Sequence, residues 1–169
     1  MAPRGFTLVE TLIAIAILTI TITGLLTVMA RMLSLGFLTE DELTASFLAS
    51  DAVEFVKSVR DTDYINDVSI TDGASGFQSL FGGCFSGTHC ELDTTDGTVA
   101  GTCGGHSSCS RLSTDGTLYG RGFGTDSPYR RSITLEDIGG YEYRLIVEVS
   151  WQGQQGTRSV THERLFYDL

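Results

Sequence analysis

The chain has 169 residues, which is room for one ordinary globular domain rather than two. An apolar content of 41% excludes wholesale disorder. The chain carries 21 acidic against 11 basic residues, a formal net charge of −10, and no cluster of Lys and Arg beyond its first residues that could neutralise phosphates. Nucleic acid is therefore not an expected partner.

The first expected element is an apolar helix near the N-terminus. Residues 11–30 contain no charged side chain; fourteen of the twenty are apolar, five are threonines and one is Gly24. As a helix they span about 30 Å, the thickness of one bilayer crossing. Residues 18–23 alternate like a buried strand, but strands rarely exceed about ten residues, and threonine hydroxyls can bond to helix carbonyls in lipid. The pattern predicts a membrane helix.

The flanks of this segment differ from those of a cleaved secretory signal. The apolar run is too long, and the residues that follow it are Arg31-Met32-Leu33 rather than a small-residue cleavage pattern. Glu10 stands at the edge of the span, where an ionisable group is costly. Glu10 is therefore a candidate functional residue.

The residues ahead of the span form a short motif, Arg4-Gly5-Phe6-Thr7-Leu8-Val9-Glu10. With the helix behind it, this motif resembles the class III signal of type IV pilins and type II secretion pseudopilins. The resemblance implies that a prepilin peptidase cleaves between Gly5 and Phe6 on the cytoplasmic side and methylates the new amino group of Phe6. It also makes Glu10 the glutamate used in assembly. The alternative is an ordinary signal anchor in which Glu10 is only a charge at the start of a helix.

A physical argument supports this use of Glu10. Cleavage leaves an α-amine on Phe6, and because the pKa of such a group is ordinarily about 7.7 to 8.0, the amine is largely cationic near neutral pH. When helices stack with an axial offset, the amine of one subunit can meet the Glu10 carboxylate of the next. A buried pair of this kind fixes register better than it adds stability.

The helical pattern continues beyond the span as an amphipathic stretch. Its apolar residues recur at helical spacing: Leu43, Phe47, Leu48, Ala52, Phe55, Val56 and Val59. We expect one long helix that ends near residues 61–63, with residues 6–33 in the membrane or filament core and residues 34–63 packed on a head domain. Residues 45–61 also resemble the corresponding helix of minor pilins.

Residues 64–128 form a variable region with an internal repeat of nineteen residues. Residues 81–99 align with residues 100–118 at seven identical positions, and each copy ends in Thr-Asp-Gly-Thr. Asp-Gly between apolar residues is a strong signal for a two-residue hairpin turn. We therefore expect two small cross-linked hairpins. Asp93 and Asp96 also suggest calcium, but a hairpin turn explains them without a metal.

The repeat contains all four cysteines, Cys84, Cys90, Cys103 and Cys109. Disulfides, a zinc site and free thiols are each possible for them. Two C-x5-C pairs fit zinc poorly, even with His89 and His106 nearby, and a head outside the cell would face oxidising conditions. We favour disulfides that join Cys84 to Cys90 and Cys103 to Cys109, since a duplicated unit can keep its own bridge; pairing across the copies would close longer loops.

Residues 129–169 are expected to form an antiparallel sheet. Strands are predicted at residues 129–135, 141–151 and 157–166, with residues 152–156 as the hairpin loop. The aromatic-x-Arg-x-Ile and Val-x-Val-x-Trp strands resemble the C-terminal sheet of minor pilins and pseudopilins. The three histidines, His89, His106 and His162, stand in no recognisable catalytic motif, so no active site, metal or cofactor is predicted.

The expected architecture is therefore α+β: a leader at residues 1–5, a long N-terminal helix, and a small antiparallel sheet head with a disulfide-bonded insertion. The resemblance implies a minor pilin or pseudopilin of a pilus, secretion or DNA-uptake fibre. Its partners would be other pilin subunits, the prepilin peptidase, a membrane assembly platform and, before assembly, the lipid bilayer. It would cross the inner membrane once, with its head outside, and then reach a cell-surface fibre. The alternative is a membrane-anchored adhesive or binding domain that never polymerises.

Overall fold

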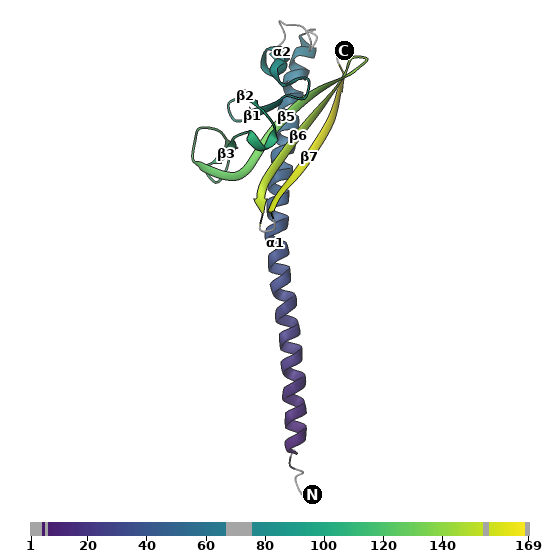
Figure 1. The fold of residues 1–169 in the computed structure, drawn as a ribbon, viewed down its shortest axis with the longest axis vertical. Coiled ribbons are helices and arrows are strands. Elements are labelled where there is room, and N and C mark those ends of the chain that lie inside the picture. Colours follow the sequence, from purple (N-terminus) through teal and green to yellow (C-terminus); the bar gives the residue numbers. More distant parts are fainter. Residues whose placement is uncertain (1–4, 6, 67–75, 154–155, 168–169) are drawn as a thin grey trace. The chain divides into compact units, whose positions relative to one another are not determined.

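A computed structural model describes residue 5 and residues 7–66, 76–153 and 156–167, apart from the side chains of residues 34, 35, 37 and 38. The chain divides into two units, residues 1–40 and residues 41–169. Helix α1 (Leu8–Ile65) contributes to both units (Figure 1). The predicted long helix is confirmed, and it ends two residues beyond the predicted range.

The first unit consists of the N-terminal part of α1. Its residues Leu8–Leu33 are long and apolar enough to cross a membrane, and none of this span is buried within the structure. Its threonines donate their hydroxyls to carbonyls three or four residues earlier; Thr21, for example, lies 2.8 Å from the carbonyl of Leu18 and 3.1 Å from that of Ile17. These bonds leave few free polar groups on a surface that otherwise presents mainly apolar side chains.

The second unit is built around one seven-stranded antiparallel sheet. Its long strands are β5 (Thr125–Gly139), β6 (Glu142–Gly153) and β7 (Gly156–Tyr167), which follow one another as neighbouring hairpins (Figure 1). They contain the three predicted C-terminal strands. Strand β5 begins four residues before its predicted start, because residues 125–130 pair with the repeat region rather than with β6 alone.

The repeat region forms two short hairpins against the other edge of β5. The first consists of β1 (His89–Asp93) and β2 (Thr98–Cys103), and the second of β3 (Arg111–Thr114) and β4 (Tyr119–Gly120). Strand β3 pairs with residues 125–130 of β5, and β1 pairs with β5 at Ile133. The two hairpins therefore occupy successive segments of a single strand edge.

Both hairpin loops are four residues long rather than the two expected from Asp-Gly. Asp93 pairs with Thr98 in the first hairpin, and Thr114 pairs with Tyr119 in the second. The same Thr-Asp-Gly-Thr letters thus occupy different positions in the two loops. In each loop an aspartate accepts bonds from the threonine two residues later: Asp96 from Thr98 and Asp115 from Thr117. The side chain, rather than a two-residue backbone turn, closes these loops.

The core lies between the inner face of the sheet and the part of α1 that belongs to the second unit. Ala45, Ala49 and Val53 are buried there beside the predicted Leu48, Ala52 and Val56, whereas Leu43 and Phe47, which share the predicted apolar pattern, are exposed. Because alanine side chains are small, the sheet can approach α1 closely. The residues of α1 that are buried therefore differ in part from those that the sequence predicted.

Two elements that the sequence did not predict complete the core. Helix α2 (Gly76–Phe81) contributes Phe77 and Phe81, both fully buried, and the 3₁₀ turn η1 (Gly82–Cys84) follows it. Asp63, near the end of α1, accepts hydrogen bonds from the backbone N–H groups of Gly76 (3.2 Å) and Phe77 (2.6 Å). A carboxylate from one helix thus caps the next, and no local sequence pattern reveals a cap thirteen residues away.

Candidate functional sites

The start of α1 has the hydrogen bonds of a capped helix. Thr7 precedes Leu8, the first helical residue, and its hydroxyl accepts a bond from the backbone N–H of Glu10 at 3.3 Å. Thr7 and Glu10 stand in the Thr-x-x-Glu spacing of a capping box. Glu10 therefore lies in the first turn of α1, at the positive end of the helix dipole.

Gly5 and Glu10 lie near each other in sequence, and among the described residues the structure places no third functional group beside them. Gly5 and Glu10 are both exposed, and Phe6 lies outside the described residues. An exposed carboxylate at the edge of an apolar span is available to a second molecule. Cleavage after Gly5, methylation of Phe6 and an assembly role for Glu10 stay predictions.

The four cysteines form two bridges, Cys84 with Cys90 and Cys103 with Cys109, each over a sequence separation of six residues. Each bridge closes the loop that leads into a strand rather than joining the two strands of one hairpin. Glu91, Cys103 and Cys109 are close enough to hold a metal ion, but the two sulfurs are bonded to each other and offer no thiolate pair. Zinc would therefore require reduction of this bridge.

Glu91 joins the two copies of the repeat. Its carboxylate accepts hydrogen bonds from the backbone of Ser110, the position equivalent to Glu91 in the second copy, and from the guanidinium of Arg121. Burial raises the pKa of Glu91, but the bonds from Ser110 and Arg121 outweigh burial and leave its pKa below the ordinary value. Glu91 therefore acts as a buried cross-link, not as a free acid.

The acidic turn residues are likewise engaged. The carboxylates of Asp93 and Asp96 each accept a backbone N–H and a threonine hydroxyl from their own loop. In the second copy, the backbone bonds from Leu118 and Thr117 hold the pKa of Asp115 down, to about 2. These contacts explain the aspartates as turn residues, and they do not gather the oxygens that calcium requires.

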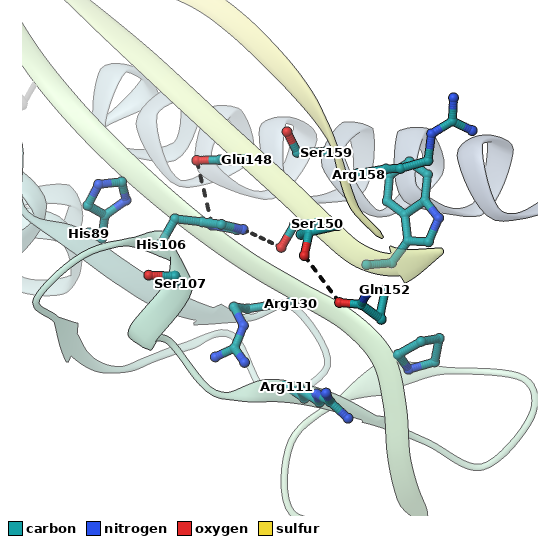
Figure 2. Close-up of a pocket in the computed structure, with 13 residues that line it drawn as sticks. His89, His106, Ser107, Arg111, Arg130, Glu148, Ser150, Gln152, Arg158 and Ser159 are labelled. Carbon is teal, nitrogen blue, oxygen red and sulfur yellow. Dashed lines mark hydrogen bonds and ion pairs between the residues drawn. The ribbon is translucent and has the colours of Figure 1, made fainter. Parts of the chain in front are cut away.

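A polar cavity, which the sequence did not predict, lies over the outer face of the sheet. It has a volume of about 530 Å³. Figure 2 shows side chains from β5, β6 and β7 and from the repeat around it. The residues that line it are His89, His106, Ser107, Arg111, Pro128, Arg130, Glu148, Ser150, Trp151, Gln152, Thr157, Arg158 and Ser159. The alternation of side chains along the strands could have predicted the part of this lining that β5 and β6 supply, since Arg130 lies opposite Ser150 in their register. No local sequence pattern indicated that His89 and His106 would line the cavity.

His106 lines the cavity and contacts both β5 and β6. It begins the 3₁₀ turn η2 (His106–Ser108), inside the loop that the Cys103–Cys109 bridge closes. Its Nδ1 lies 2.7 Å from the hydroxyl oxygen of Ser132 on β5, and its Nε2 lies 2.7 Å from that of Ser150 on β6 (Figure 2 shows the second contact). The imidazole thus bridges two strands, and the disulfide-closed loop positions it.

The surroundings of His106 favour its neutral form. Burial lowers the pKa of His106, and His89 and Arg130 lower it further, whereas Glu148 raises it. The Glu148 carboxylate lies 3.8 Å from Nδ1 of His106, too far for a short hydrogen bond. The net result is a pKa below the ordinary histidine value of 6.5.

Serine, histidine and glutamate side by side invite comparison with a hydrolase triad. In a triad the acid hydrogen-bonds the histidine directly and the serine is open to substrate. Here Nδ1 of His106 meets Ser132 rather than Glu148, and Ser150 is only 7% exposed. The geometry is that of a structural cross-link between strands.

Comparison with known families identifies the N-terminal segment of the chain. Residues 1–26 match the family described as the prokaryotic N-terminal methylation motif. Neither the comparison with curated proteins nor that with solved structures gave a match. The match covers the Gly5–Phe6 junction, Glu10 and the first part of the apolar helix, which are the residues that carry the resemblance seen in the sequence. The chain thus carries a prokaryotic N-terminal methylation motif that continues into an apolar helix, and this combination is consistent with a type IV pilin-like protein.

Proposed function

We propose that the protein is a minor pilin or pseudopilin, a structural subunit of a type IV pilus or of a related secretion or uptake fibre. Prepilin peptidase removes residues 1–5 and methylates Phe6. The mature subunit stays anchored in the inner membrane with its head outside. The assembly platform then incorporates it into the fibre beside other pilins. The observation that carries this proposal is the match of residues 1–26 to the methylation motif, continued by an apolar span that nothing within the structure covers.

The exposed span supports assembly on physical grounds. The 26 residues of Leu8–Leu33 present apolar side chains without partners in their own chain. Lipid can cover them before assembly, and the helices of neighbouring subunits can cover them afterwards. Glu10 is the one carboxylate in this stretch, and in a fibre it needs a cation such as the Phe6 amine of another subunit.

A substitution at Glu10 tests assembly. Glu10→Gln keeps the shape of the side chain and the apolar span but removes the charge, so the protein should still insert in the membrane. Its amount in sheared fibres, measured by quantitative immunoblot, should fall about tenfold or more, since a charge-assisted contact of about 1.5 to 3 kcal/mol is lost. Glu10→Asp should fall between Glu10→Gln and the unaltered protein.

Glu42→Gln serves as the matched control, because Glu42 is an exposed acid on the same helix outside the span. It should reach fibres normally. If the unaltered protein stays in the membrane fraction and never reaches sheared fibres of a piliated cell, it is instead a non-polymerising anchored domain.

A further inference from the structure

The cavity over the outer face of β5 and β6 is positively charged, although the protein as a whole has a net charge of −10. Among the described head residues, five cations form ion pairs with a carboxylate: Lys57, Arg60, Arg121, Arg131 and Arg144. Arg111 and Arg130, which line the cavity, form none within that part of the chain. Three arginines, Arg111, Arg130 and Arg158, therefore line the cavity against a single carboxylate, Glu148, and the lining carries a net positive charge.

Arg111 and Arg130 also face each other across a strand pair. They are directly opposite in the antiparallel register of β3 and β5, so their side chains leave the same face of the sheet. Figure 2 shows the two guanidinium groups on neighbouring segments, below His106 and Ser107. Like charges directly opposite destabilise a sheet. An anion that accepts hydrogen bonds from both would convert this repulsion into attraction.

The carboxylate in the cavity lining does not neutralise this pair. Glu148 lies on β6, and among the described residues it forms no ion pair with Arg111 or Arg130. The neutral donors and acceptors around the cavity, namely Ser107, Gln152, Thr157 and Ser159, suit a ligand that carries hydroxyl groups as well as charge. A volume of about 530 Å³ lies within the range of small-molecule sites.

We propose that this cavity binds an acidic sugar, whose carboxylate or sulfate bridges Arg111 and Arg130 and whose hydroxyls meet the serine, threonine and glutamine side chains. The head would then hold acidic polysaccharide, whether or not the protein enters a fibre. The loop that carries His106 and the Cys103–Cys109 bridge forms one wall of the site, so the repeat insertion supplies part of the specificity.

The test is a titration of the full chain in detergent with glucuronate and, separately, with glucose at the same ionic strength. Trp151 is the only tryptophan of the chain and lines the cavity, so its fluorescence reports binding, and calorimetry provides a second readout. Glucuronate should bind saturably and glucose should not. Equal binding of the two, or no saturable binding of glucuronate in either readout, overturns the proposal. Inorganic sulfate that binds as tightly as glucuronate would show an oxyanion site and would reject the sugar.

Charge variants locate the site. Arg130→Gln should weaken glucuronate binding about tenfold to a hundredfold, the effect of losing a hydrogen bond to a charged group. Arg164→Gln removes the same charge from β7 outside this cavity and should leave the affinity unchanged. Because Arg130→Gln relieves a repulsion, it should fold at least as stably as the unaltered protein. If Arg130→Gln does not fold, Arg111→Gln takes its place. Unchanged glucuronate affinity in the variants that fold overturns the proposal.

Discussion

Arg131 holds three parts of the head together through one side chain. It is fully buried, and its guanidinium donates to the carbonyl of Leu48 and the carboxylate of Asp51 on α1, each at 3.1 Å. It also donates to the carbonyl of Leu92 at 2.9 Å and to Thr94 at 3.2 Å. Burial lowers the pKa of Arg131 and Asp51 raises it, so the ion pair offsets part of the cost of burying the charge.

Truncating Arg131 should therefore destabilise the head. Arg131→Ala leaves a cavity at a buried position and removes the four hydrogen bonds of the guanidinium, and should lower the free energy of unfolding by about 2 to 5 kcal/mol. Arg131→Met, which refills the volume without the charge, should lower it less. Arg130→Ala, the neighbour on the opposite face, should change it by about 0.5 kcal/mol or less. Urea unfolding in detergent, followed by Trp151 fluorescence, measures all three. Equal effects of the two alanine variants would contradict this account.

The lowered pKa of His106 predicts that the stability of the head falls as the pH falls. Its folded-state pKa lies below 6.5, so the unfolded chain binds the proton more tightly. The contribution of the neutral imidazole to stability is complete above pH 6.5 and is lost as the pH falls from 6.5 through the lowered folded value.

Thermal unfolding between about pH 8 and pH 5 measures this contribution. His106→Gln should flatten the decline in midpoint temperature as the pH falls below the ordinary histidine value. His162→Gln is the matched control and should not flatten it, since His162 lies outside the cavity and contacts Ser46 on α1 instead. An identical decline in His106→Gln would assign the dependence to other groups.

At the scale of elements, the two disulfide bridges stabilise the repeat region, although each closes only a short loop. The segment of residues 81–120 is rich in glycine and has few apolar residues, and in the loop-entropy model each short bridge contributes roughly 2 kcal/mol. Oxidation should protect this segment from protease, and reduction should expose it while α1 and β5–β7 persist. Limited proteolysis with and without reductant, followed by mass spectrometry, checks this. Cleavage at the same rate in both states would show that the bridges do not hold the hairpins.

Peptide mapping without reductant determines the pairing of the cysteines if the protease cleaves between the two copies of the repeat. Trypsin keeps all four in one peptide, since no Lys or Arg lies between Arg60 and Arg111. Cleavage before Asp93 and Asp96 separates the copies. Without reductant, the pairing in the structure should then release Cys84–Cys90 and Cys103–Cys109 in separate peptides, whereas pairing across the copies would keep the two peptides joined. Four thiols alkylated in undisturbed protein would reject both pairings.

The sequence predicted the elements whose signals are local and regular. The 58-residue helix and the three long strands follow from period and turn residues, and both were found. Helix α2 was missed because it is six residues long and depends on Asp63 for its cap. The cavity was missed because His106 reaches Ser132 and Ser150, 26 and 44 residues away. Local patterns do not encode such contacts; register and loop closure create them.

At the scale of the whole molecule, the chain combines two surfaces with different requirements. The apolar span Leu8–Leu33 has no cover of its own, while residues 41–169 form a unit with its own buried core. A subunit that moves from membrane to fibre needs both properties: a helix that lipid and other helices can each cover, and a head that keeps its structure throughout. In the proposed function, processing at Gly5 is the step that links the two environments.

The intact mass of the protein extracted from membranes of its native host tests the central claim most directly. We expect a mature chain that begins at N-methyl-Phe6, lacks residues 1–5, and has the mass of the fully oxidised form with two disulfides. The same extract from cells without prepilin peptidase should give the full-length, unmethylated chain. A chain that keeps residues 1–5 in peptidase-positive cells would contradict the account.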